Sequence, residues 1–79
     1  MTDSTQGVRP VYWTGQAPIH CDLCARPLGN TFVDGATKPQ GRWGSLDLKC
    51  HRVHGVDIGA GKGQVFRKQD DGRWLKIEG

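Results

Sequence analysis

The sequence predicts a small α+β domain that is held together by a bound metal ion and ends in a β-hairpin. Three observations lead to this prediction. Only 35% of the 79 residues are hydrophobic and 12 are glycine, so the apolar core is small, and domains of this size commonly need a further source of stability. The chain contains a Cys-x-x-Cys pair, which is a common metal-binding motif. An Asp-Gly dipeptide separates two β-prone segments near the C-terminus.

The length of the chain predicts a single domain. Small and polar residues dominate residues 1–10, which we expect to form a flexible N-terminal arm, and residues 11–79 form the metal-binding domain. Short β-prone segments are expected at residues 11–14, which contain two aromatic residues, and at residues 31–35, where a glycine ends the strand. Residues 36–44 are rich in turn-forming residues and are expected to be a loop.

One helix is expected, within residues 45–54. Ser45 is a suitable N-cap for this helix, and Gly55 is well placed just beyond its C-terminus. A glycine-rich connection follows at residues 55–64. The helix is therefore short, about three turns at most.

The C-terminal segment, residues 64–79, is expected to form a β-hairpin. Asp71-Gly72 is a strong signal for a two-residue turn. A turn at this position fixes which residues face one another across the two strands. The expected pairs are Phe66 with Ile77, Lys68 with Leu75, and Gln69 with Trp74.

The cysteines predict a zinc site. Cys21 and Cys24 have the spacing that lets both sulfurs of a tight turn bind one ion, and Cys50 is expected to be the third ligand. A redox role for the pair is disfavoured because the chain lacks the βαβ pattern in which such pairs occur. Thiolate ligands favour Zn²⁺, and a fully coordinated ion would be structural, contributing on the order of 10 kcal/mol to folding.

The fourth ligand is open among four residues. Asp47 lies three residues before Cys50, which places both on one side of a helix start, and aspartate can bind zinc. His54 lies four residues after Cys50 and shares its helical face. His51 and His20 are the remaining candidates. Asp47 and His54 also have ordinary explanations, because an acidic residue near a helix start and a cation near a helix end are both favoured by the helix dipole.

A formal net charge of +3 permits a nucleic-acid partner but does not require one. The candidate contacts are Arg42, Lys49, Arg52 and Lys62. Trp43 and Trp74 could stack on bases, although in a chain with so few apolar residues tryptophans are more often part of the core. Self-association is a further alternative.

No apolar run in the sequence is long enough to span a membrane, so no membrane partner is expected. The N-terminus also lacks a basic segment followed by an apolar stretch, which a secretory signal peptide would have. We therefore expect the chain to reside inside a cell or to be assembled there. In that setting cysteines act as thiolates more often than as disulfides.

Part of the sequence resembles the treble-clef zinc scaffold of the HNH endonucleases. The segments "CDLC", "FVDG", "KPQG" and "LDLKCH" occur in the order in which that family has a Cys-x-x-Cys pair, a strand with an Asp-His dyad, a loop and a second cysteine-containing segment. The resemblance implies a treble-clef-like or zinc-ribbon-like domain. The family's dyad is Asp34-Gly35 in this chain, and glycine cannot act as a general base. The resemblance therefore implies the scaffold without the nuclease chemistry.

A second resemblance covers residues 19–79. The run from "CDLC" through "GRW" and "GAGKGQ" to the final "KIEG" is similar to small uncharacterised phage-encoded zinc-binding proteins. Those proteins carry a second full Cys-x-x-Cys where this chain has Asp47 and Cys50, which implies Asp47 or a histidine as the substitute ligand. This resemblance implies a location in the virion or the host cytoplasm.

These observations give three functional hypotheses. The first is a non-catalytic, zinc-stapled interaction module of a phage, most simply a virion structural protein that is associated with the capsid or decorates it. The second is a nucleic-acid-binding protein on an HNH-derived scaffold. The third is a residual metal-dependent nuclease that uses His51 or His54, and the absent Asp-His dyad argues against it.

Overall fold

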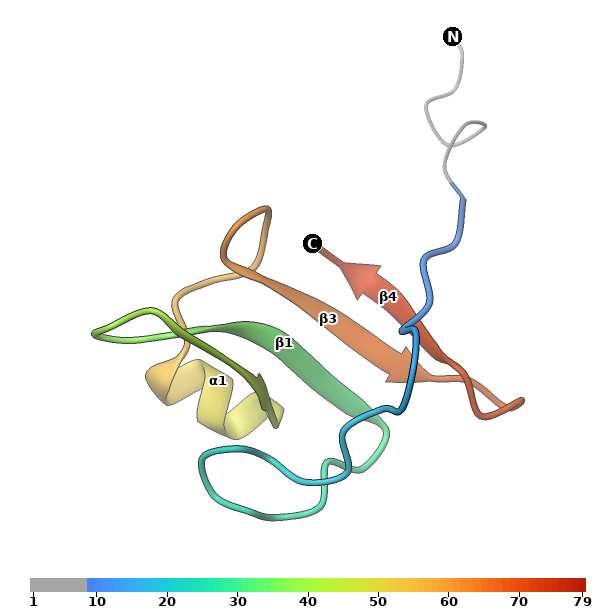
Figure 1. Ribbon diagram of the computed structural model, residues 1–79, viewed down its shortest axis with the longest axis horizontal. Helices are drawn as coiled ribbons and strands as arrows, with labels where there is room; N and C mark the ends of the chain where they lie inside the picture. Colours follow the sequence, from blue (N-terminus) through green and yellow to red (C-terminus); the bar gives the residue numbers. More distant parts are fainter. Residues whose placement is uncertain (1–8) are drawn as a thin grey trace, which may run out of the picture.

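The computed structural model describes residues 9–79, so most of the expected N-terminal arm lies outside the described residues. The described chain contains four strands and one helix (Figure 1). Their bounds are Thr31–Thr37 for β1, Arg42–Leu46 for β2, Leu48–His54 for α1, Gly63–Lys68 for β3 and Trp74–Glu78 for β4. The small α+β class predicted from the sequence is confirmed.

The strands form one antiparallel sheet in the order β2-β1-β3-β4. Across the two central strands, Phe32 pairs with Phe66, and Val33 pairs with Val65 on one side and with Leu46 of β2 on the other. Because neighbouring residues of a strand point to opposite faces, the sheet has an aromatic face around Phe32 and an aliphatic face around Val33.

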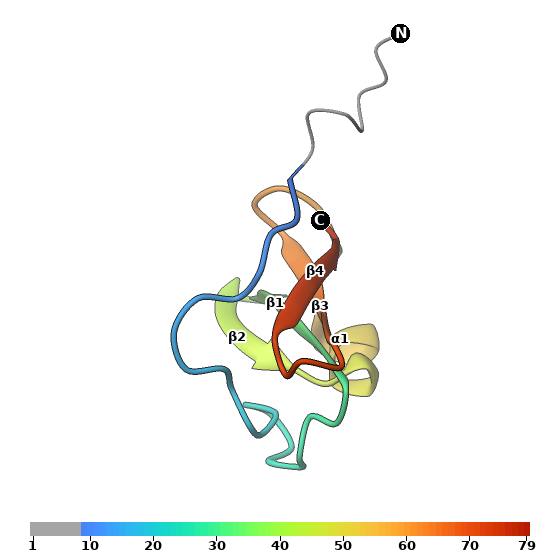
Figure 2. The same cartoon turned by 90° about the vertical axis from the view of Figure 1, so that its right-hand side faces the viewer.

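Each face of the sheet is covered by a different segment. Figure 2 shows α1 on one side of the sheet and the N-terminal segment on the other. The helix packs against β1 and β2, and its Cys50 contacts the buried core. On the aromatic face, the Trp13 ring meets Phe32 and Phe66 edge-on, with ring centroids 5.4 Å and 5.3 Å apart. Such edge-to-face contacts stabilise an aromatic cluster by more than the burial of apolar area alone would give.

The β-prone segment at residues 11–14 extends the sheet beyond β4. Tyr12 forms an isolated bridge with Leu75, and the Trp13 amide donates to the Trp74 carbonyl at 2.9 Å. The Arg73 guanidinium lies 4.1 Å from the centroid of the Tyr12 ring, which is a favourable cation–π distance. The edge of β4 is thus partly covered by the chain itself.

The helix begins later than expected, and its N-cap is not Ser45. Asp47 is the N-cap of α1, and its Oδ1 accepts the Cys50 amide at 2.6 Å. Ser45 belongs to β2, where its amide donates to Asp22 Oδ2 at 2.8 Å and its carbonyl accepts the Asp22 amide at 2.9 Å. The backbone of Ser45 is thus committed to pairing along the sheet edge and cannot begin a helix.

The position of Gly55 directly after α1 is confirmed, but the reason is space and not an unusual backbone angle. Its φ is −75°, and its amide donates to the His51 carbonyl at 2.8 Å. A Cβ at this position would overlap His51 Cδ2 and would lie 2.6 Å from the His51 carbonyl oxygen. Any side chain at Gly55 would therefore collide with the last turn of the helix.

The expected loop at residues 36–44 is wrong in part, because β1 continues to Thr37 and β2 begins at Arg42. The glycines of this region have low strand propensity, and they made the sequence resemble a loop. A Cβ at Gly44 in β2 would lie 3.0 Å from Asp22 Oδ2, so the glycine leaves room for the cysteine-containing turn to approach the sheet edge.

The C-terminal hairpin is confirmed, but its register differs by one residue from the expected one. Phe66 pairs with Lys76, and Lys68 pairs with Trp74. The Gln69 amide donates to the Arg73 carbonyl at 2.7 Å, which closes a three-residue loop that ends in Gly72 with φ +90°. This loop type places one more residue in the turn than the expected two-residue turn, which shifts the pairs next to the turn by one residue. A bulge between Val65 and Phe66 reverses the shift, so Val65 lies opposite Glu78.

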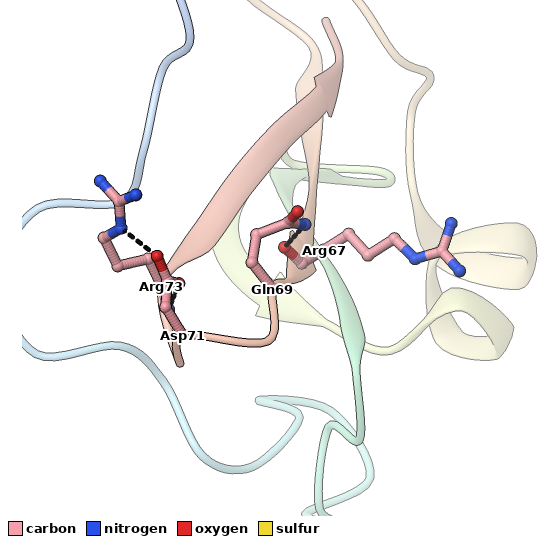
Figure 3. Close-up of polar contacts among 4 residues, drawn as sticks. All are labelled: Arg67, Gln69, Asp71 and Arg73. Carbon is pink, nitrogen blue, oxygen red and sulfur yellow. Dashed lines mark hydrogen bonds and ion pairs between the residues drawn. The ribbon is translucent and has the colours of Figure 1, made fainter.

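Side chains support this loop from both sides (Figure 3). Asp71 accepts the Arg73 amide at 2.9 Å through Oδ1 and the Arg73 Nε–H at 2.8 Å through Oδ2. Gln69 donates through Nε2 to the Arg67 carbonyl at 2.9 Å. The Arg67 side chain itself extends away from the Asp71–Arg73 pair. The pKa of Asp71 is held below its usual value, chiefly by the hydrogen bond from the Arg73 amide and next by the one from the Arg73 guanidinium.

Within residues 9–79, α1 is the one helix, and it is far too short to cross a membrane.

Candidate metal centre

The Cys-x-x-Cys pair lies in a compact turn, shown below α1 in Figure 1. The Cys21 amide donates to the Arg26 carbonyl at 2.8 Å, and the Ala25 amide donates to the Cys21 carbonyl at 2.9 Å. Ala25 has φ +64°, a left-handed conformation that few residues other than glycine adopt. This sharp reversal after Cys24 brings the two sulfurs to the same side of the turn.

Backbone N–H groups point at the first sulfur of this turn. The Leu23 amide donates to Cys21 Sγ at 3.4 Å. Burial would raise the pKa of the Cys21 thiol, but hydrogen bonds from the backbone of Asp47, Cys24 and Leu23 outweigh that and lower it. The environment of Cys21, which is only 2% exposed, thus favours the thiolate, the form that binds metal.

Asp47 and Cys50 enter from the start of α1. With Oδ1 bound to the Cys50 amide, the other carboxylate oxygen of Asp47 faces the cysteine pair, and Cys24 Sγ donates to this Oδ2 at 3.1 Å. The first turn of the helix places Cys50 Sγ beside the same oxygen, because residues three apart share a helical face. The helix start therefore supplies two of the four donor atoms.

Four donor atoms converge at this point. The sulfurs of Cys21, Cys24 and Cys50 and a carboxylate oxygen of Asp47 all lie within 4.8 Å of one another. Zinc–sulfur bonds of about 2.3 Å in a tetrahedron place two sulfurs roughly 3.8 Å apart. The four residues could therefore hold a metal ion with small movements of their side chains.

The cluster carries more acidic groups than it can ionise without a cation. Desolvation, followed by the neighbouring Cys21 and Cys24 thiols and the Asp47 carboxylate, raises the pKa of Cys50 to about 12. An amide hydrogen bond from Arg26 lowers the pKa of Cys24, but the Asp47 carboxylate and desolvation together raise it. A divalent cation would remove this conflict because it stabilises every anionic ligand at once.

The histidines lie outside the four-residue group. His51 Nε2 lies 3.3 Å from the Asp57 carbonyl oxygen, where it can donate a hydrogen bond, and so it points towards the glycine-rich connection. His20 is exposed and pairs with Pro27 within the cysteine-containing turn. His54, which the sequence made as strong a ligand candidate as Asp47, is exposed at the end of α1. Of the two leading candidates, the structure brings Asp47 into the group.

A shallow pocket of about 210 Å³ adjoins the cluster. His54 contributes to this pocket, so it lies near the metal-binding residues without joining them. Arg26 lines the same pocket and contributes, after the hydrogen bonds from Cys50 and Cys24, to the lowered pKa of Asp47. The lining residues are Cys24, Arg26, Asp47, Lys49, Cys50, Val53 and His54.

The candidate nucleic-acid contacts fall on separate elements. Lys49 and Arg52 lie on α1, Arg42 begins β2, and Lys62 directly precedes β3. All four side chains are exposed. The sequence suggested them as one group, but the fold divides them between the helix and the sheet.

Asp22 is a site residue that the sequence analysis did not single out. Its backbone and carboxylate bind Ser45, which ties the cysteine-containing turn to β2 just ahead of Asp47. The letter D within "CDLC" gave no sign of this contact, because the contact depends on a strand that was itself not expected.

No family model matches the chain, and no curated protein or solved structure matches it either. The assignment of the metal centre therefore depends on its own geometry and donor chemistry.

Proposed function

We propose that this protein is a non-catalytic binding module whose fold is held together by one structural zinc ion at Cys21, Cys24, Asp47 and Cys50. The observation that supports this most strongly is the convergence of three sulfurs and one carboxylate oxygen within 4.8 Å. Three thiolates favour zinc over the harder cations, which prefer oxygen ligands. The four donors would fill a tetrahedral coordination sphere.

The positions of the ligands support a structural role for the ion. Two ligands come from the turn before β1 and two from the start of α1, so one ion would join segments that are distant in sequence. Cys21 belongs to the buried core and Cys50 packs against it. Zinc would thus add to a core whose buried hydrophobic residues are few, and its binding free energy would become folding free energy.

The order of elements also supports a treble-clef-like assignment. A cysteine-containing turn is followed by the β1–β2 hairpin and then by a helix whose first turn supplies the second pair of ligands. This is the order that the resemblance to the HNH scaffold implies.

The surroundings of Asp34 favour a non-catalytic role. In the HNH pattern this aspartate precedes the general base, which is Gly35 here. Both carboxylate oxygens of Asp34 are already engaged, Oδ1 by Trp43 Nε1 at 2.7 Å and Oδ2 by Gln64 Nε2 at 3.0 Å. An aspartate held in this way supports the architecture of the sheet. The association with a phage capsid, and with it the location in the virion or host cytoplasm, stays a prediction that depends on the sequence resemblance.

Native mass spectrometry of the purified protein, with and without a strong chelator, tests the zinc assignment. We expect one zinc ion per chain, and we expect circular dichroism to show loss of the fold when the chelator removes it. Cys24→Ser should reduce the zinc content because it removes an exposed ligand without disturbing the core. A protein that stays folded and free of metal in zinc-containing buffer would refute the proposal.

His54→Gln is the matched control for this experiment. His54 lines the same pocket as the cluster but lies outside the four-residue group, so its substitution should leave the zinc content at one per chain. Loss of zinc from His54→Gln, with Asp47→Asn retaining it, would transfer the fourth ligand to His54.

A further inference from the structure

Trp43 is an exposed aromatic side chain in a fixed orientation. It is 51% exposed, yet its indole N–H donates to Asp34 Oδ1 at 2.7 Å, and Gln64 holds the other oxygen of the same carboxylate. The ring is therefore anchored through its only polar atom. What remains available to a partner is the flat, apolar part of the indole.

Lys38 and Lys62 lie near Trp43. Lys38 belongs to the turn that joins β1 to β2. Arg42, the neighbour of Trp43 in β2, points to the opposite face of the sheet. Trp43 pairs with Ala36, and the Ala36 amide donates to the Lys62 carbonyl at 2.9 Å, so Lys62 lies in the same row across the sheet. With strands about 4.8 Å apart, the backbones of Trp43 and Lys62 are separated by roughly 10 Å.

Lys38 and Lys62 are exposed and unpaired within residues 9–79, where the ion pair that forms is Arg73 with Asp71. The nearby acidic side chains are engaged instead. Asp34 is bound by Trp43 and Gln64, as described above. Asp22 Oδ2 accepts the Ser45 amide, and Asp57 Oδ1 accepts the Ile58 amide. The cations are therefore available for an anionic partner.

From this arrangement we infer that Trp43, together with Lys38 and Lys62, forms a binding surface for single-stranded nucleic acid. A base stacks on the exposed indole, and the two lysines bind the adjacent phosphates. Base–aromatic stacking with a basic surround is the common basis of single-strand binding without strong sequence preference. The inference depends on the proposed role as a binding module, because it names the partner of that module.

A protein partner fits this surface less well. The centre of a protein interface is depleted in charged residues, and its key aromatic side chains are surrounded by contacts that exclude water. Asp34 binds the indole of Trp43 and Gln64 binds Asp34, so polar and charged groups adjoin the ring. A duplex fits less well too, since bases within it are stacked on one another and cannot stack on a protein ring.

The test measures fluorescence anisotropy of a labelled oligothymidylate of about 15 nucleotides, with zinc-loaded protein at low salt, about 50 mM. Binding by the unmodified protein is expected. Trp43→Ala should weaken it roughly ten-fold, because it removes one stacked base. Two phosphate contacts predict a slope of log K against log salt of about −1.4, and Lys62→Gln should make it shallower by roughly 0.7.

Arg67→Gln is the matched charge control. Arg67 is exposed, it pairs with Thr31 at the opposite end of β1, and its side chain lies on the other face of the sheet from Phe32 and Trp43. We expect the substitution to leave the affinity within two-fold of the unmodified protein, since it lies outside the surface. Equal losses from Lys62→Gln and Arg67→Gln would mean diffuse electrostatic attraction and would overturn the inference.

Two further arms distinguish this inference from the zinc proposal and from a general polyanion surface. Zinc content and circular dichroism are measured on the same samples, so a folded, zinc-loaded protein that fails to bind the oligonucleotide refutes the inference alone. Oligoglutamate of equal charge serves as competitor. The inference falls if two results occur together. The first is that oligoglutamate displaces the labelled oligonucleotide as effectively as unlabelled oligothymidylate does. The second is that Trp43→Ala changes neither competitor's effect, which would mean that there is no stacking site.

Discussion

Asp47 and Cys50 are joined by a hydrogen bond of 2.6 Å from the Cys50 amide to Oδ1 of Asp47, and both residues belong to the candidate metal centre. One oxygen of the Asp47 carboxylate thus caps the N-terminus of α1, and the other oxygen faces the cysteine sulfurs. The formation of the helix and the assembly of the metal-binding group are therefore coupled through Asp47.

The two roles of Asp47 can be separated by substitution. Asp47→Asn retains an oxygen that can cap α1 but loses the negative charge, so it should weaken zinc binding while preserving the helix start. Asp47→Ala loses both, and in saturating zinc it should be less stable than Asp47→Asn by about 1 kcal/mol. Competition with a chromophoric chelator gives the affinity, and thermal unfolding gives the stability. Zinc affinity unchanged in Asp47→Asn would show that the carboxylate is not a ligand.

Zinc binding should weaken as the pH falls. Because the raised pKa values of Cys50, about 12, and Cys24 keep both thiols protonated near neutral pH, the ion must displace their protons. At least two protons should therefore be released per zinc ion bound, and the log of the apparent affinity should rise by about two or more for each pH unit. Calorimetry in buffers of different ionisation enthalpy measures this release. Binding without proton release would contradict the thiol assignment.

Without metal, the pH dependence should have the opposite sign. The folded-state pKa of Cys50, about 12, lies above its ordinary value of 9.0, so its contribution to stability is present below pH 9 and is lost as the pH rises towards 12. In reducing, chelator-containing buffer, any remaining folded population should fall over this alkaline range. Circular dichroism against pH measures it, and a metal-free fold that gains stability above pH 9 would contradict the raised pKa.

Gly55→Ala should destabilise the protein by about 1–3 kcal/mol, which is typical of overpacking. The added Cβ would overlap His51 Cδ2 and lie 2.6 Å from the His51 carbonyl oxygen, and the backbone contact cannot be relieved by a rotamer change. Chemical denaturation of zinc-loaded protein measures the effect. His51→Ala removes the side-chain contact alone, so combining the two substitutions should recover only part of the loss. Full recovery would show that the backbone contact is harmless.

Trp13 and Trp43 should respond differently to alanine. Trp13 packs edge-on against Phe32 and Phe66, so Trp13→Ala should cost about 2 kcal/mol, less than the 3–5 kcal/mol of a fully buried aromatic. Trp43 is 51% exposed, so Trp43→Ala should lose chiefly its hydrogen bond to Asp34, at a cost of about 1 kcal/mol. Denaturant unfolding compares the two. A large loss for Trp43→Ala would mean that its bond to Asp34 is structural, and the nucleic-acid test would then need Trp43→Gln, which retains an N–H donor but has no ring to stack.

The sequence by itself determined those features that depend on neighbouring residues. The spacing of Cys21 and Cys24 predicted a metal-binding turn, and Asp71-Gly72 predicted a hairpin, because both are local chemical patterns. The helix end at His54 followed from Gly55. Even here the details shifted, since Gly72 with φ +90° ends a three-residue loop and moves the strand register by one residue.

Tertiary structure decided what depends on contacts between distant segments. Asp47 and His54 have nearly equivalent positions relative to Cys50 on a helix, and only the packing of the cysteine-containing turn against the start of α1 brought Asp47 into the group. Likewise, β2 contains a glycine that weakens its strand pattern. The strand forms because β1 pairs with one of its edges and Asp22 with the other. Hydrogen bonds made across the sheet thus overrode the local preference of the chain, because a strand is stabilised by its partners.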